Sequence, residues 1–159
     1  MTFDAVALAR AIHVLSVVHW IGGVAVVTTI VLPRLRKSLR AEAAIFEFEA
    51  FERRFAFQAR ISILLAGLSG AYLLMTLDGW TRLQLLAFWW LHLMIAVWFL
   101  FAMMIYVLEP LLVHRLFHTY ALRNKERAFA MAIKLHIVAL LASAIAVGAG
   151  VMGAHGGLP

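Results

Sequence analysis

Four long apolar stretches separated by short polar segments dominate the chain. No charged residue occurs from Ala11 to Leu32 or from Ile61 to Leu77. Two further stretches, at about Leu83–Leu108 and Ala128–Met152, contain Lys134 as their single charged residue. With a rise of about 1.5 Å per residue, a helix of roughly 20 residues crosses the hydrocarbon core of a bilayer. The pattern predicts four transmembrane helices in a single domain over 1–159, at about 8–32, 57–77, 83–108 and 128–152.

Residues that end helices follow the first three apolar stretches. Pro33-Arg34 ends the first, Asp78-Gly79-Trp80 the second and Glu109-Pro110 the third. The first ten residues lack the basic flank and cleavage site of a signal peptide. We therefore expect the first apolar stretch to be a retained helix.

Basic residues are distributed unevenly between the predicted loops. Seven Lys or Arg residues lie between positions 33 and 60 and four between 110 and 128, whereas the other side has Arg10 and Arg82. Cytoplasmic loops carry the excess of Lys and Arg in membrane proteins. The sequence predicts a multi-pass protein of a bacterial-type inner (plasma) membrane, with both termini on the non-cytoplasmic side.

The segment before the second apolar stretch has its own pattern. Phe48, Phe51 and Phe55 recur at helical spacing among charged residues, which is typical of an amphipathic helix at a membrane interface. We expect this helix to extend the second transmembrane helix. The predicted fold class is all-α: an integral membrane four-helix bundle with an amphipathic cytoplasmic extension before helix two.

Composition indicates that the lipid bilayer is the main partner of the chain. Hydrophobic residues make up 65% of it and charged residues 14%, against roughly 25% charged in a soluble domain. We expect the net charge of +6 to face anionic lipid headgroups, and we predict no nucleic-acid partner. The absence of cysteine excludes thiolate metal ligands, iron–sulfur clusters and cysteine nucleophiles.

Seven histidines in so apolar a chain are the main indication of function, because a polar group in hydrocarbon is costly without a partner. Their depths decide which can meet. At about 1.5 Å per residue, His13 lies roughly 8 Å below the outer surface, His92 about 12 Å, His19 about 16 Å, and His136 about 24 Å, from the opposite end. His13 and His92 match best, and two imidazoles at similar depth can bind both axial positions of a haem iron.

Neighbouring residues fit a macrocycle. Trp20 lies seven residues after His13 on the same helix face, and Trp89 lies one turn before His92, so either can pack beside a porphyrin. His19 points elsewhere, and it or His136 is a candidate for a supporting role or a second haem. A small-residue stripe can admit a flat cofactor, and it comprises Ala146, Gly150 and Ala154. The alternative for each histidine is a hydrogen bond to a hydroxyl or carbonyl of a neighbouring helix, and for each tryptophan a lipid-facing or core position.

Two competing interpretations use other chemistry. His155 and His13, with Met75 and Met152 near the outer surface, offer imidazole and thioether ligands for copper. This set predicts a copper transport or delivery protein. The third interpretation is a cofactor-free membrane assembly subunit, in which the histidines only bond between helices.

Short motifs resemble two known groups. The run from His13 to Gly23, HVLSVVHWIGG, resembles the first helix of small CopD-like membrane proteins, which are commonly labelled copper-resistance or copper-export proteins. The layout is also remotely similar to HemJ-type protoporphyrinogen oxidase, a haem-b-binding four-helix protein. Further CopD-like motifs are Phe51-Glu52-Arg53-Arg54-Phe55, Trp89-Trp90-Leu91-His92, Leu135-His136 and His155-Gly156, and the HemJ-like ones are Leu32-Pro33-Arg34-Leu35, Glu52-Arg53-Arg54 and Leu91-His92.

The HemJ-like resemblance implies that His13 is a haem ligand. The HemJ pattern has a lysine two residues after the helix-three histidine, where this chain has Met94, and this departure argues against protoporphyrinogen oxidation. We therefore predict a haem-b-binding protein with His13 and His92 as axial ligands, acting in electron transfer or as a membrane oxidoreductase. Besides lipid, we expect two kinds of partner: a quinone or membrane redox protein, and further copies of the chain in a homo-oligomer.

Overall fold

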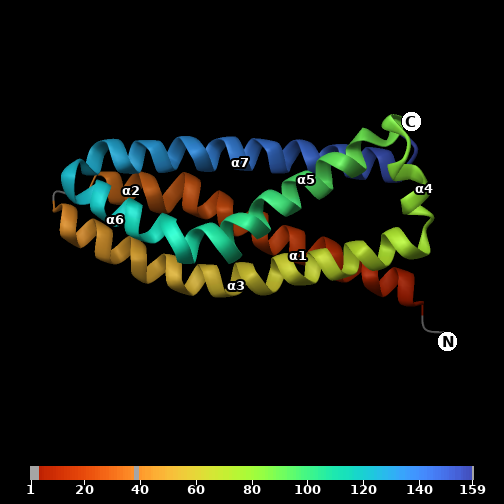
Figure 1. Ribbon diagram of the computed structural model, residues 1–159, viewed down its shortest axis with the longest axis horizontal. Coiled ribbons are helices and arrows are strands. Elements are labelled where there is room, and N and C mark those ends of the chain that lie inside the picture. The colour runs from red at the N-terminus through yellow and green to blue at the C-terminus, as the bar shows by residue number, and fades with distance from the viewer. Residues whose placement is uncertain (1–3, 38–39, 159) are drawn as a thin grey trace.

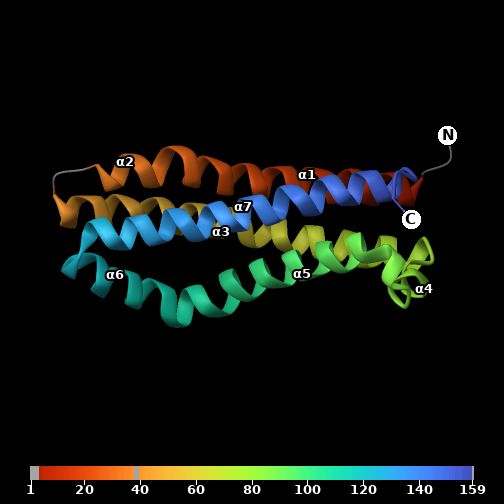
Figure 2. The ribbon, with the colours of Figure 1, turned by 90° about the horizontal axis from the view of Figure 1, so that it is seen from above.

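The computed structural model describes residues 4–37 and 40–158, and within these ranges the side chains of residues 112–115 lie outside the description. Every element in the described residues is helical. Four long rods lie side by side in one elongated bundle (Figures 1 and 2). The predicted fold class is confirmed, although each rod extends beyond its predicted bounds at one end or both. Each rod contains a segment long and apolar enough to cross a membrane, and these segments are Ala5–Arg36, Ala41–Thr76, Leu86–Leu111 and Lys125–Ala154.

The first rod continues through a proline. It comprises α1 (Ala5–Val26), the π-helical segment η1 (Val27–Val31) and α2 (Leu32–Arg36). The Asp4 carboxylate caps α1 by accepting two backbone N–H groups, each at 3.0 Å. The predicted end at residue 32 is wrong because the rod continues past Pro33 to Arg36, and the proline directly follows the π-helical η1.

The second and fourth rods are single helices. α3 (Ala41–Thr76) is continuous, so the amphipathic extension and the second transmembrane helix form one element, as predicted. α7 (Lys125–Ala154) is capped at its start by Asn124, whose side chain accepts a hydrogen bond from the Arg127 N–H at 3.1 Å.

The third rod is the least regular. It follows a turn at Asp78, which has a left-handed backbone conformation with φ of 54°. Its elements, in chain order, are α4 (Gly79–Leu83), η2 (Leu86–Phe88), α5 (Trp89–Met103), the π-helical η3 (Met104–Val113) and α6 (His114–Arg123).

The bend of the third rod lies at η3, which contains Pro110 (Figure 2). Because proline has no N–H, the carbonyl of Ile105, five residues earlier, receives no donor from it in a π-helical register. Arg60 of α3 donates Nε–H to that carbonyl at 3.4 Å and binds Glu109 through Nη2 at 2.6 Å. The predicted end at residue 108 is therefore wrong, since these contacts support a helix that continues past the proline.

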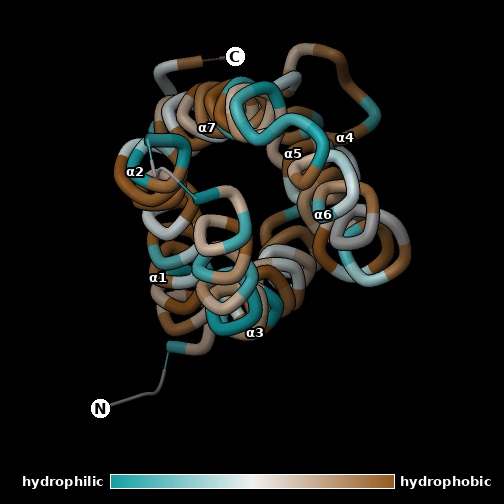
Figure 3. The backbone as a smooth tube through the Cα atoms, turned by 90° about the vertical axis from the view of Figure 1, so that its left-hand side faces the viewer, coloured by the Kyte–Doolittle hydropathy of each residue, from teal (hydrophilic) through white to brown (hydrophobic). Residues whose placement is uncertain are grey.

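The rods occupy four corners when viewed along the bundle axis (Figure 3). α1 packs chiefly on α3, and α5 packs chiefly on α7, so α1 and α5 lie diagonally across the bundle. α1 and α5 both start at the end that holds the two chain termini, here called the terminal end (Figure 1). α3 and α7 run toward this terminal end from the opposite, loop end. α1 and α5 are consequently parallel.

Two apolar clusters fill the bundle between these ends. Near the loop end, Phe48 packs against the rings of Phe117 and Phe129. Phe48 lies on the apolar face of the predicted amphipathic helix, and it is buried because α6 and α7 cover this face of α3. The second cluster lies nearer the middle and comprises Trp20, Val24, Ile63, Val97 and Ala146.

Candidate functional site

His13 lies half-buried on the inward side of α1, toward the terminal end. Its Nδ1 lies 2.9 Å from the carbonyl oxygen of Ala66 and 3.2 Å from Oγ of Ser69, both on α3. A carbonyl oxygen only accepts, so Nδ1 carries the proton. In the neutral ring the lone pair is then on Nε2, the arrangement by which carbonyl-bonded histidines in metalloproteins present Nε2 to a metal.

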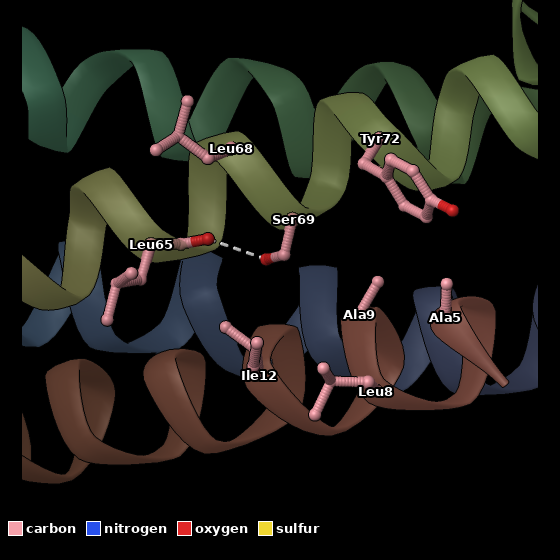
Figure 4. A pocket seen from close by; sticks show the side chains of 8 residues that line it. All are labelled: Ala5, Leu8, Ala9, Ile12, Leu65, Leu68, Ser69 and Tyr72. Carbon is pink, nitrogen blue, oxygen red and sulfur yellow. Dashed lines mark hydrogen bonds between the residues drawn. The ribbon is translucent and has the colours of Figure 1, made fainter. Parts of the chain in front are cut away.

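The Ser69 hydroxyl donates to the carbonyl of Leu65 at 2.6 Å, as Figure 4 shows. Ser69 therefore accepts from His13 rather than donating to it, and both contacts favour the same tautomer. Ser69 also borders an apolar groove of about 310 Å³ between α1 and α3, which opens to the outside of the bundle (Figure 4). The remaining lining consists of Ala5, Leu8, Ala9, Ile12, Leu65, Leu68 and Tyr72, which suits a lipid chain more than a reactive group.

His19 repeats the same bonding pattern on the outer surface of the bundle. Its Nδ1 lies 2.8 Å from Oγ of Ser62, and that hydroxyl donates to the carbonyl of Gln58 at 3.1 Å. The His19 side chain is exposed on the lipid-facing side of α1. Ser62 and Ser69 lie seven residues apart on α3, and this spacing is the sequence feature that could have predicted both histidine partners.

His92 does not share a contact with His13. Its Nδ1 lies 3.1 Å from the Phe88 carbonyl oxygen and its Nε2 lies 2.9 Å from that of Leu83. Both nitrogens therefore face hydrogen-bond acceptors on their own rod, and neither presents a lone pair to a metal in this arrangement. The pairing of His13 with His92 stays a prediction, and the observed contacts do not favour it.

Of the two tryptophans at the start of α5, Trp90 and not Trp89 faces the bundle interior. Trp89, predicted to pack beside a cofactor, is 44% exposed. Trp90 is buried instead and lies against Gly153 of α7, where a Cβ would clash with the indole. The helical phase of α5, which begins only at residue 89, decides which indole faces inward.

His136 lies half-buried on α7, with Nδ1 at 2.9 Å from the Ala132 carbonyl oxygen. By the argument used for His13, its Nε2 holds the lone pair of the neutral ring. Gly150 of α7 contacts Met94, and His136 precedes Gly150 by fourteen residues, which is about 20 Å along a helix. His136 is thus available as a ligand at a different level of the bundle.

Three of the four predicted copper ligands are exposed, whereas His13 is half-buried. His155 is exposed and its Nδ1 lies 2.8 Å from the Val151 carbonyl oxygen. Met75 is 70% exposed and Met152 is 52% exposed. Within the described residues there is no group of three or more His, Cys, Asp or Glu side chains placed to hold a metal ion.

Trp20 provides an observation that the sequence could not give. Its side chain is 3% exposed and packs edge-to-face on Phe101 of α5, with ring centroids 4.7 Å apart. Trp20 Nε1 is buried and has no hydrogen-bond partner among the residues that the structure describes. Trp98, by contrast, donates its Nε1–H to the Ile63 carbonyl at 2.8 Å. An unsatisfied buried donor costs about 1–3 kcal/mol, which favours an acceptor supplied from outside the chain.

No family model, curated protein or solved structure matches the chain. The likeness to CopD-like and HemJ-type proteins therefore depends on the short motifs given above. The function has to be argued from the arrangement of these side chains.

Proposed function

We propose that this four-helix membrane protein binds haem b within the terminal half of the bundle and transfers electrons. The observation that carries the proposal is the inward-facing His13, whose Nδ1–H is held by the Ala66 carbonyl while Nε2 keeps its lone pair. A haem iron needs only one or two protein ligands. The site therefore requires no larger cluster of metal-binding side chains.

The surroundings of His13 support a macrocycle. Trp20 lies seven residues further along α1 on the same face, and its orphan Nε1–H can donate to a polar substituent of the group. Gly70 of α3 allows the imidazole to lie close to α3, since a Cβ there would lie 3.1 Å from Cε1 of His13. When bound, haem supplies one-electron redox chemistry, and the chain binds, orients and shields it from water.

His136 is a candidate ligand for a second haem rather than for the same iron. The predicted depths of His13 and His136, roughly 8 Å and 24 Å below the outer surface, are too far apart for two ligands of one metal. Electrons entering at one level would then leave near the other, toward a quinone or a membrane redox partner. An arrangement with two haems predicts two redox steps in a potentiometric titration.

The test is the visible spectrum of the protein purified in detergent from haem-replete cells. We expect a Soret band, and alpha and beta bands that sharpen on reduction with dithionite, with at least one haem per chain by pyridine haemochrome assay. Elemental analysis of the same sample discriminates the copper interpretation. A colourless protein with stoichiometric copper, or with no metal at all, would remove the haem proposal.

The orientation in the membrane is a second part of the proposal, since Lys and Arg gather at the loop end. The chain has no cysteine, so single-cysteine variants can be labelled without background. Gln84, between α4 and η2, and Thr119, in α6, are exposed at opposite ends. We expect an impermeant maleimide to label Gln84→Cys in intact spheroplasts and Thr119→Cys only after lysis.

Neither substitution changes the distribution of charge, so the labelling reports the native topology. Labelling of both variants with a permeant maleimide controls for accessibility of the thiol. The reverse pattern, with Thr119→Cys labelled from outside, would place the termini in the cytoplasm and contradict the proposed orientation.

A further inference from the structure

The register between α1 and α5 identifies which residue of α5 lies opposite His13. The two helices are parallel and diagonal (Figures 1 and 3). Trp20 of α1 and Phe101 of α5 are in ring contact across the bundle interior. Residues seven apart lie on nearly the same face of a helix, about 10 Å apart along it. Seven residues closer to the terminal end, His13 lies on the face of α1 that carries Trp20. Met94 likewise lies on the face of α5 that carries Phe101.

Met94 faces the interior independently of this register. Its Sδ lies where a Cβ on Gly150 of α7 would come within 2.5 Å. Met94 also packs against the cluster that contains Trp20 and against a third cluster at the terminal end, which comprises Trp90, Leu91 and Ala149. The thioether thus lies between α5 and α7, while the imidazole of His13 lies between α1 and α3. The two potential ligands are on opposite sides of the same level of the bundle.

We propose that the thioether of Met94 is the second axial ligand of the haem iron, opposite Nε2 of His13. This inference rests on the proposed haem function. Methionine is a neutral sulfur ligand that, paired with histidine, raises the reduction potential of a haem above that of a bis-histidine site. The assignment replaces His92, whose two nitrogens face carbonyl oxygens, by the residue two positions further along α5.

The side chain at position 94 is long and flexible enough for the proposed role. Met94 is unbranched with three rotatable bonds, so its sulfur can leave the Gly150 surface and reach inward without moving the backbone of α5. A β-branched or short residue at 94 would lack this reach.

The spectrum of the ferric protein tests the inference, because iron(III) coordinated by a thioether has a weak charge-transfer band in the far red that bis-histidine haem lacks. We expect this band in the unmodified protein and its complete loss in Met94→Leu, with the reduced alpha band broadened or lost. Met94→His should restore a low-spin spectrum without the far-red band and with a lower midpoint potential. Met75→Leu, a matched change at an exposed methionine of the same end, should leave the spectrum unchanged.

These outcomes distinguish a failure of the proposed haem function from a failure of the methionine assignment. A protein without haem removes the proposed function and this inference with it. A haem protein whose far-red band is absent, or persists in Met94→Leu, overturns the methionine assignment alone. Circular dichroism and elution volume of Met94→Leu show whether the variant is folded, and Met94→His supplies the readout if it is not.

Discussion

Replacing His13 by Gln is expected to abolish haem binding at this site, so that haem per chain and the Soret absorbance both fall by the contribution of this haem. Glutamine keeps the polarity and approximate reach of histidine, so its side-chain amide can still donate to the Ala66 carbonyl that now accepts from Nδ1. The ligand lone pair of Nε2 is removed, however, and a neutral amide is a poor iron ligand. The measurement is haem per chain by pyridine haemochrome assay, together with the oxidised and reduced spectra.

Two matched substitutions control for the general loss of an intramembrane imidazole. His19→Gln removes a histidine with the same serine-bonded tautomer that lies on the outer surface, and His92→Gln removes one that lies at a similar predicted depth. Both variants should retain haem. If His92→Gln loses haem while His13→Gln keeps it, the assignment of the helix-one ligand is wrong. If all three keep it, a ligand outside this group holds the iron, with His136 the next residue to test.

The architecture followed from the sequence because hydropathy is a local property. Each of the four apolar stretches gave a rod, and the amphipathic spacing of Phe48, Phe51 and Phe55 gave a helical extension continuous with α3. The ends were predicted less well. Proline tends to end a helix, but Pro33 lies within a rod that continues from the π-helical η1, and Pro110 is supported by Arg60 from another rod. A contact across 45 positions of sequence is not visible in a local pattern.

The site was predicted only in part, because depth alone does not fix the direction of a side chain. We paired His13 with His92 because their predicted depths are similar. However, the irregular turn before α5 rotates His92 toward Leu83 and directs Trp90 and Met94 inward. The partners of His13 are a carbonyl and a serine, and a carbonyl partner leaves no trace in the sequence. The lack of a hydrogen-bond partner for Trp20 Nε1 likewise could not be predicted, because it depends on which acceptors the other rods place nearby.

Close packing between α1 and α3 makes this part of the fold sensitive to substitution. The same packing positions His13. Gly23 of α1 lies against the ring of Phe55, and a Cβ added there would overlap the ring. Phe55 has little freedom to move aside, because it stacks on Phe51 and packs against both apolar clusters. The neighbouring Gly22 faces outward, with nothing within 4 Å of an added Cβ. The two adjacent glycines therefore form an internal pair of test and control.

Gly23→Ala is expected to destabilise the protein by about 1–3 kcal/mol, the usual cost of overpacking a filled core. For a chain of this size that lowers the apparent Tm in detergent by roughly 2–12 °C, and Gly23→Leu should prevent recovery of monodisperse protein. Gly22→Ala should be neutral or stabilising by up to ~1 kcal/mol, because alanine favours the helix over glycine. Tryptophan fluorescence or a thiol-independent dye during heating gives the measurement. Equal melting temperatures for the two alanine variants would show that Phe55 yields, and that α1 does not approach α3 as closely as the ring contact requires.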